Sequence, residues 1–176
     1  PVTPDAYDTS FNGGTSLQYE GSTTINFPNG VDLFISRFSQ DGSQLQASTY
    51  VGGSGNDGLN YRNFVYPDEY ALIMMGNDSL YFNYGDGARG EIITDDLNNI
   101  YVGSTTTSTN FPVSPNCIQS FNKGRQEGIV FKIDYNLKNL MWSTYLGGIK
   151  DDAIYSIDCD NEYNVLVTGG TNSLNF

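Results

Sequence analysis

The sequence predicts an all-β fold of short antiparallel strands, and three observations support this prediction. Tyr and Phe are abundant, with 13 and 10 copies among 176 residues, and aromatic side chains favour strands. Gly, Asn, Ser and Thr recur in short clusters, which is typical of closely spaced turns. No stretch of the sequence shows a sustained helical period of apolar residues. We therefore expect many short strands joined by tight turns.

An internal repeat organises these strands. Ser-Thr-Tyr-Val-Gly-Gly at residues 48–53 returns as Ser-Thr-Tyr-Leu-Gly-Gly at residues 143–148, an offset of 95 residues. At the same offset, the segment 32–38 matches 127–133, with acidic, apolar and basic positions in the same order. This agreement without a gap predicts that the chain contains two copies of one structural unit.

Insertions in the first copy change the offset further along the chain. Residues 99–102 match 164–167 at an offset of 65, which places about 30 extra residues near 56–85 of the first copy. Pro-Val-Thr-Pro at residues 1–4 matches Pro-Val-Ser-Pro at 112–115 at an offset of 111, which implies a second insertion near 13–30. We therefore expect a first repeat at 1–111 with two insertions and a plain second repeat at 112–176.

The second repeat predicts four strands, at about 128–134, 140–146, 153–159 and 165–168. Tandem four-stranded antiparallel units are typical of β-propeller blades, because each blade buries the apolar faces of its neighbours. Two blades cannot close a ring. We therefore expect two blades of a larger propeller, a native chain that continues beyond both ends, and the remaining blades of that chain as partners.

These motifs resemble the SBBP repeat of large secreted bacterial proteins. The resemblance is carried by the Ser-Thr-Tyr-Leu-Gly-Gly element, by Asn-x-Tyr-Val or its variant at 99–102 and 164–167, and by Asn-Phe-Pro at 110–112. It covers most of the chain apart from the insertions. The resemblance implies a propeller fold, secretion and attachment to a cell surface, but no defined activity or ligand.

The charge of the chain argues against two classes of partner. Twenty acidic and eight basic residues give a formal net charge of −12, which repels phosphate backbones and anionic lipid. No apolar run is long enough to span a bilayer. We therefore expect no nucleic-acid partner and no membrane insertion.

The residue types present also disfavour catalysis. The chain has no His, which removes Ser-His-Asp and Cys-His catalysis and His-ligated zinc. The adjacent acids Asp95-Asp96 and Asp151-Asp152 are candidates for glycoside hydrolysis, but adjacent acids in turns are usually solvated. The segment 55–58, Gly-Asn-Asp-Gly, favours a tight turn. We therefore predict that the chain is not an enzyme.

A calcium site is the one cofactor that the sequence suggests. Oxygen ligands alternate along one segment, loosely like an EF-hand loop, at Asp158, Asp160, Glu162 and Asn164. The segment lacks the central Gly and distal Glu of such a loop, and two of the four matching positions of the first repeat are Ile93 and Leu97. The preferred interpretation is a hairpin turn without a cofactor.

The 56–85 insertion predicts an extra aromatic hairpin. Aromatic side chains favour recognition of proteins and stack on sugars, and the candidate ligand-binding residues are Tyr66, Tyr70, Tyr81, Phe82 and Tyr84. The preferred interpretation is that they pack the hairpin onto its own blade. If they are exposed instead, cell-surface proteins or glycans are candidate partners. The cysteines, Cys117 and Cys159, allow one disulfide or two free thiols.

Together these observations predict a non-catalytic propeller segment of a secreted or cell-surface bacterial protein, which serves adhesion, scaffolding or protein–protein interaction. The alternative is an accessory carbohydrate-binding module of a secreted enzyme, suggested by the aromatic insertion.

Overall fold

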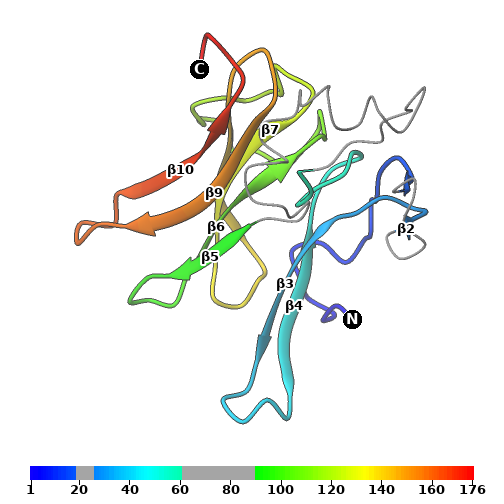
Figure 1. Ribbon diagram of the computed structural model, residues 1–176. Helices are drawn as coiled ribbons and strands as arrows, with labels where there is room; N and C mark the ends of the chain where they lie inside the picture. Colours follow the sequence, from blue (N-terminus) through cyan, green and yellow to red (C-terminus); the bar gives the residue numbers. More distant parts are fainter. Residues whose placement is uncertain (19–25, 61–89) are drawn as a thin grey trace.

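The computed structural model describes residues 1–18, 26–60 and 90–176 and is drawn in Figure 1. These residues form strands and turns and no helix, so the all-β prediction is confirmed for them. The strands, in chain order, are β1 (Leu17–Gln18), β2 (Asn26–Phe27), β3 (Leu33–Phe38), β4 (Leu45–Val51), β5 (Glu91–Thr94), β6 (Ile100–Thr106), β7 (Glu127–Ile133), β8 (Leu140–Leu146), β9 (Asp152–Cys159) and β10 (Val165–Thr171). Among the described residues, no helix is long and apolar enough to cross a membrane.

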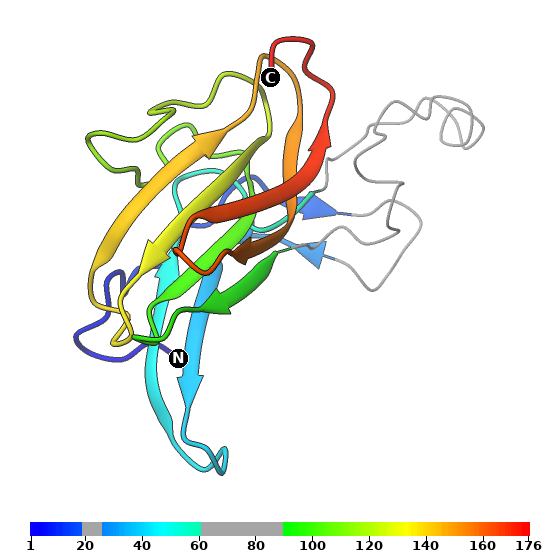
Figure 2. The same ribbon diagram turned by 90° about the vertical axis from the view of Figure 1, so that its left-hand side faces the viewer.

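Antiparallel pairing groups the strands into one larger sheet and three hairpins. The larger sheet has four strands in the order β5-β6-β7-β8, and β3–β4, β9–β10 and the short β1–β2 pair by themselves. Figures 1 and 2 show the four-stranded sheet between the β3–β4 and β9–β10 hairpins. Core clusters on its two faces account for this stacking.

Four of the strands of the first repeat, β3 to β6, have their predicted counterparts in the second, whereas the short β1 and β2 lie in the 13–30 insertion and have none. β3 and β4 match β7 and β8 at the offset of 95, and β5 and β6 match β9 and β10 at the offset of 65. The grouping into sheets differs from the expectation of four strands per repeat. The four-stranded sheet crosses the boundary at 111/112, because β6 pairs with β7, whereas β8 does not pair with β9. After β6, the segment 107–126 leads the chain back to the free edge of β6, and β7 then pairs with β6 there.

Two apolar faces of the four-stranded sheet form the core. We call the face that packs on β3–β4 the leading face and the face that packs on β9–β10 the trailing face. Leading-face residues are Ile100, Val102, Ile129, Phe131, Ile133 and Tyr145, which cluster with Ile35, Ala47 and Val51 of the first hairpin. Trailing-face residues are Tyr101, Val130, Trp142 and Leu146, which cluster with Ile154, Ile157, Val165 and Val167 of the last hairpin.

A short segment covers the outer edge of β4 and of β8 in the same way. The Thr3 amide donates to the Ser48 carbonyl at 3.0 Å, and the Ser48 amide donates to Thr3 Oγ1 at 3.2 Å. Ser114 makes the equivalent bonds with Ser143, at 3.0 Å and 2.6 Å. The predicted offset of 111 between these segments is thus reflected in their hydrogen bonds.

Candidate functional site

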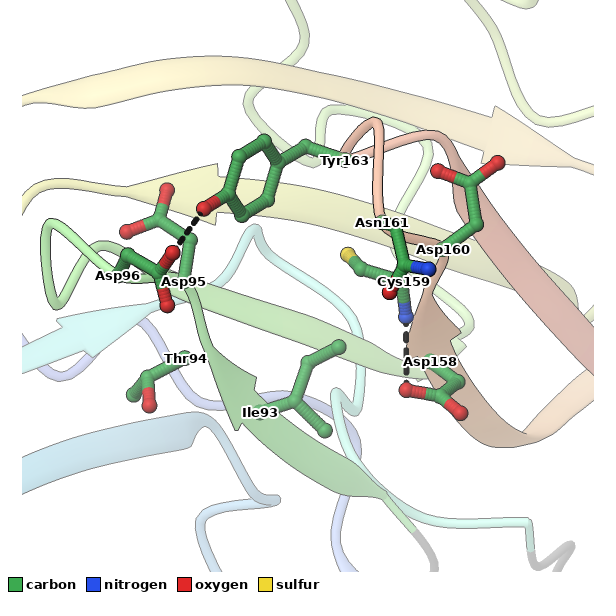
Figure 3. Close-up of a pocket in the computed structure, with 9 residues that line it drawn as sticks. All are labelled: Ile93, Thr94, Asp95, Asp96, Asp158, Cys159, Asp160, Asn161 and Tyr163. Carbon is green, nitrogen blue, oxygen red and sulfur yellow. Dashed lines mark hydrogen bonds between the residues drawn. The ribbon is translucent and has the colours of Figure 1, made fainter.

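A pocket of about 270 Å³ lies between the β5–β6 and β9–β10 turns and is shown in Figure 3. The two turns are equivalent positions of the two repeats. The residues that line the pocket are Ile93, Thr94, Asp95, Asp96, Asp158, Cys159, Asp160, Asn161 and Tyr163. Four of them are aspartates, so the pocket is strongly acidic.

The same hydrogen-bonded turn forms both walls of the pocket. Asp95 Oδ1 accepts from the Leu97 and Asn99 amides at 3.0 Å and 2.8 Å, and Asp95 Oδ2 accepts from Asn99 Nδ2 at 3.0 Å. Asp160 accepts from the Glu162 amide at 2.9 Å and from the Asn164 amide and Nδ2, both at 2.8 Å. An Asp followed four residues later by Asn therefore closes each hairpin.

This geometry assigns the predicted calcium residues to the turn. Asp160 and Asn164 bond each other, Glu162 contributes its backbone amide, and Asp158 accepts from the Cys159 amide at 2.8 Å. Within the described residues, no group of three or more His, Cys, Asp or Glu side chains is placed to hold a metal ion. The contacts favour the hairpin-turn interpretation over the calcium one.

Lys132 neutralises one of the four aspartates. Its Nζ lies 2.9 Å from Asp95 Oδ2, donates to the Tyr101 hydroxyl at 2.6 Å and lies 4.5 Å from the centre of the Tyr101 ring. Although burial opposes ionisation, the hydrogen bond and charge of Lys132 and the bonds from Asn99 lower the pKa of Asp95. The same partners raise the pKa of Lys132 against the effect of its own burial. Both groups are therefore charged at neutral pH.

The remaining lining groups leave the pocket an acceptor surface. The Tyr163 hydroxyl donates to Asp96, and this hydrogen bond raises the pKa of Tyr163 (Figure 3). Burial, with the charge of Asp158, raises the pKa of the Cys159 thiol, so the thiol stays protonated and is a poor nucleophile at neutral pH. The pocket therefore presents carboxylate acceptors that could bind a cationic or hydroxyl-bearing ligand.

A second polar cluster lies deep in the first repeat, where Asp32 and Asp57 approach each other across Gly52. A Cβ atom added to Gly52 would lie 2.9 Å from Asp32 Oδ1 and 2.7 Å from Asp57 Oδ2, so only glycine fits between these carboxylates. Asp57 is fully buried and Asp32 is 7% exposed. The groups that donate to Asp57 are the Gly53 amide and the hydroxyls of Thr106 and Ser108.

The second repeat contains the same pair, Glu127 and Asp152, across Gly147. A Cβ atom on Gly147 would overlap Glu127 Oε2 and lie 2.6 Å from Asp152 Oδ2. The Gly148 amide and the Ser173 hydroxyl donate to Asp152 at 2.7 Å and 2.9 Å, as their counterparts do in the first repeat. The carboxylate pair is therefore a constant element of the repeat.

Burial dominates the electrostatics of these pairs. It raises the pKa of Asp57 to about 6 despite the hydrogen bonds from Thr106, Gly53 and Ser108, and the charge of Asp32 adds to the rise. Burial likewise raises the pKa of Asp32 and of Glu127. Oδ1 of Asp32 and Oε2 of Glu127 have no hydrogen-bond partner within the described part of the chain. These buried carboxylates accept hydrogen bonds from loop amides, at Gly13, Gly53 and Gly124, and so fasten loops to strand ends.

The predicted site residues have different outcomes. The aromatic candidates of the insertion, Tyr66, Tyr70, Tyr81, Phe82 and Tyr84, lie outside the described residues. The expectation of solvated acids in turns is wrong for Asp151 and Asp152, which are 3% and 0% exposed because they pack at the start of β9. Asp57, interpreted as part of a turn, is a buried acceptor. Cys117 and Cys159 are both free thiols.

An apolar surface that sequence analysis did not single out lies on the outer side of the β3–β4 hairpin. Phe34 and Phe38 are 69% and 58% exposed, and they line a groove of about 400 Å³ together with Pro1, Val2, Ser36, Leu45, Ser48 and Tyr50. Their counterparts at the offset of 95 lie in the core: Ile129 and Ile133 are both 0% exposed. Comparing the two copies at the offset of 95 could therefore have pointed to this surface, because apolar residues occupy these positions in both.

No protein-family model matches this chain, and no curated protein matches it either. The resemblance to the SBBP repeat thus stands on the motifs alone.

Proposed function

We propose that this chain is a segment of a β-propeller from a secreted or cell-surface bacterial protein, and that it serves adhesion, scaffolding or protein–protein interaction rather than catalysis. The observation that supports this best is that the same packing of sheet on sheet is repeated along the chain. The β3–β4 hairpin, the four-stranded sheet and the β9–β10 hairpin stack face to face, and equivalent residues fill equivalent positions in each layer. Radial stacking of such sheets is the principle of a propeller.

The polar network gives independent support. Each repeat fastens its glycine-rich strand end with a buried carboxylate pair and a Thr-x-Ser segment, at residues 106–108 and 171–173. A structural element that recurs with its hydrogen bonds intact serves the architecture rather than a single active centre. The acidic pocket has acceptors but no activated nucleophile among its lining residues, which agrees with a binding role.

The architecture is tested by determining the structure of the full-length gene product that contains this segment. We expect further four-stranded sheets, each taking two strands from each of two successive repeats, arranged around one axis. A protein in which no repeat adjoins residues 1–176, or in which the neighbouring repeats form separate domains, would contradict the proposal.

Two measurements on the source cells test the role. Fractionation should place the protein in the extracellular or surface fraction, with a cytoplasmic enzyme as the marker for lysis. Deletion of the gene should reduce attachment to surfaces or to other cells, while growth and secreted hydrolase activities stay unchanged. Loss of a secreted activity with normal attachment would favour the alternative, an accessory module of an enzyme.

A further inference from the structure

Glu127 and Asp152 form a buried pair of carboxyls without a cationic partner. Both residues are 0% exposed, and none of the ion pairs among the described residues includes either of them. They meet across Gly147, where an added Cβ atom would overlap Glu127 Oε2 and lie 2.6 Å from Asp152 Oδ2. Two ionised carboxylates in one buried site are costly, because each charge is poorly solvated and repels the other. The pair therefore needs a neutralising charge or a proton.

The hydrogen bonds of the pair leave a place for one proton. Glu127 Oε1 accepts from the Lys123 and Gly124 amides at 2.7 Å and 2.9 Å, and Asp152 Oδ2 accepts from the Gly148 amide at 2.7 Å. The other oxygen of each carboxyl, Glu127 Oε2 and Asp152 Oδ1, has no partner within the described part of the chain. A proton held between the carboxyls supplies the hydrogen bond that both lack. Burial, with the charge of Asp152, raises the pKa of Glu127, although the two amides oppose the rise.

The cations beside the pair are engaged elsewhere. The charged or titratable groups around it are Lys123, Arg125, Asp151, Tyr145 and, through Thr106 opposite Glu127 in the β6–β7 pairing, Asp57. Lys123 is exposed and its Nζ donates to the Gly147 carbonyl at 3.4 Å, whereas Arg125 lies 3.2 Å from Asp151. Burial, with the charges of Asp57 and Glu127, raises the pKa of Tyr145 to about 12, so this hydroxyl is neutral. A proton is therefore the neutralising group that these surroundings favour.

The pair holds three loops to the ends of strands. Glu127 fastens the segment 122–126 through backbone amides, and Asp152 fastens the loop after β8 through Gly148 and the segment after β10 through the Ser173 hydroxyl. The Asp152 amide donates to the Gln126 carbonyl at 3.0 Å, which joins two of these loops directly. Repulsion between two ionised carboxylates would therefore act on all three loops at once.

We propose that Glu127 and Asp152 hold one proton between them in weakly acidic solution, and that the release of this proton to water as the pH rises loosens the three loops. The proton lies on Glu127 Oε2 and is donated to Asp152, so the closed pair carries one negative charge and the open pair two. Because the pKa of Glu127 is raised above 4.5, the stabilisation is fully present below pH 4.5 and is lost as the pH rises through the raised value. This latch goes beyond the proposed function, since it does not depend on the propeller.

Amide chemical shifts, followed by NMR from about pH 3 to about pH 8, test whether the proton is shared. The Lys123 and Gly124 amides report on Glu127, and the Gly148 amide reports on Asp152. All three signals should show one common step above pH 4.5, because two groups that share a proton titrate as a pair. Their midpoints should agree within about 0.3 pH unit.

Matched variants separate a shared proton from burial alone. Asp152→Asn removes the repelling charge and offers an amide donor to Glu127, so the midpoint at the Lys123 amide should fall by at least about one pH unit. Asp151→Asn changes the neighbouring buried acid, which faces Arg125, and should move that midpoint by less than about 0.3 unit. Circular dichroism at about pH 5 establishes that each variant is folded.

Hydrogen exchange measures the loosening itself. The protection factor of the Asp152 amide, which is the exchange rate of an unstructured chain divided by that of the protein at the same pH, should fall at least about tenfold from about pH 5 to about pH 8. Glu127→Gln places a permanent donor where the proton lay and should abolish this fall. The Asn99 amide is the reference, because it donates to Asp95, whose pKa is lowered, and its protection should stay constant.

Three results would overturn the proposal. A Gly148 signal that stays constant while the Lys123 and Gly124 signals titrate would assign the proton to Glu127 alone. A Lys123 midpoint that Asp152→Asn does not move would show that the two carboxyls are not coupled. Constant protection of the Asp152 amide across the titration would show that the proton does not hold the loops. None of these results bears on the propeller architecture, which is judged on the full-length gene product.

Discussion

Replacement of Asp57 by Asn should change how the stability of this chain depends on pH. The Asp57 carboxyl is fully buried beside Asp32, and its pKa is raised from 3.8 to about 6. In the native state the carboxyl therefore binds a proton at a pH where the unfolded chain has already lost it. The stabilisation that this proton provides is fully present below pH 3.8 and is lost as the pH rises through about 6.

The magnitude follows from the shift. A shift of about two pKa units corresponds to about 3 kcal/mol between the two ends of the window. The side-chain amide introduced by Asp57→Asn would not titrate; it can donate to the Thr106 and Ser108 hydroxyls while its oxygen accepts from the Gly53 amide. The free energy of unfolding of the native chain, minus that of Asp57→Asn, should therefore fall by about 3 kcal/mol between about pH 3.5 and pH 7.

Urea unfolding at half-unit steps of pH, followed by Trp142 fluorescence, measures this difference. The subtraction removes the contributions of the other carboxyls. Asp41→Asn is the matched control of opposite sign, because hydrogen bonds from Ser39 and Ser43 lower the pKa of the exposed Asp41 to about 2. For Asp41 the native-minus-variant difference should rise as the pH increases from about 2 to 4. A flat Asp57 difference across the window would refute the reasoning that burial dominates this site.

Three further substitutions test the packing and the polar contacts. Tyr145→Phe should lower the free energy of unfolding by about 1–3 kcal/mol, because the buried hydroxyl accepts from the Phe111 amide and donates to a backbone carbonyl. At the equivalent, half-buried Tyr50 the same change should lower it by less than about 0.5 kcal/mol. Equal losses at the two positions would contradict this expectation. Gly147→Ala should lower the midpoint of thermal unfolding by several degrees, since the added methyl overlaps a carboxylate. Lys132→Met should raise the pKa of Asp95, measured by NMR titration, because its cationic partner at 2.9 Å is removed; an unchanged titration would exclude that ion pair.

Repeat alignment located the strands because the hydrophobic pattern of each strand is local. The offsets of 95 and 65 residues matched β3 to β6 of the first repeat with their counterparts, as seen for β3 with β7 and β6 with β10. The pairing of strands is not local. A repeat can be divided at any point without changing its alignment, so the boundary at 111/112 said nothing about whether β6 pairs with β5 alone or also with β7.

For the candidate sites too, local contacts could be predicted from the sequence and long-range contacts could not. The hairpin turn at Asp160 and Asn164 was accessible from sequence, since its donors and acceptor lie within four residues. The carboxylate pairs were not, because Asp32 and Asp57 lie 25 positions apart and meet only when two strand ends come together across Gly52. The sequence did contain a usable signal for these pairs: Asp32 and Glu127, like Asp57 and Asp152, are separated by the repeat offset of 95 residues. An acidic residue present at the same position of both copies indicates a structural role.

The four-stranded sheet takes β5–β6 from the first repeat and β7–β8 from the second, and this has a consequence for how repeats can be added to such a chain. Under the proposed propeller architecture, a duplicated unit carries two strands that complete the sheet before it, as β7–β8 do, and two that would begin the sheet after it. One unit in isolation would then hold two half-sheets and no complete one. On that architecture a unit gained by duplication completes its sheets only beside existing neighbours, and the loss of an internal unit leaves flanking half-sheets that can meet in the same register.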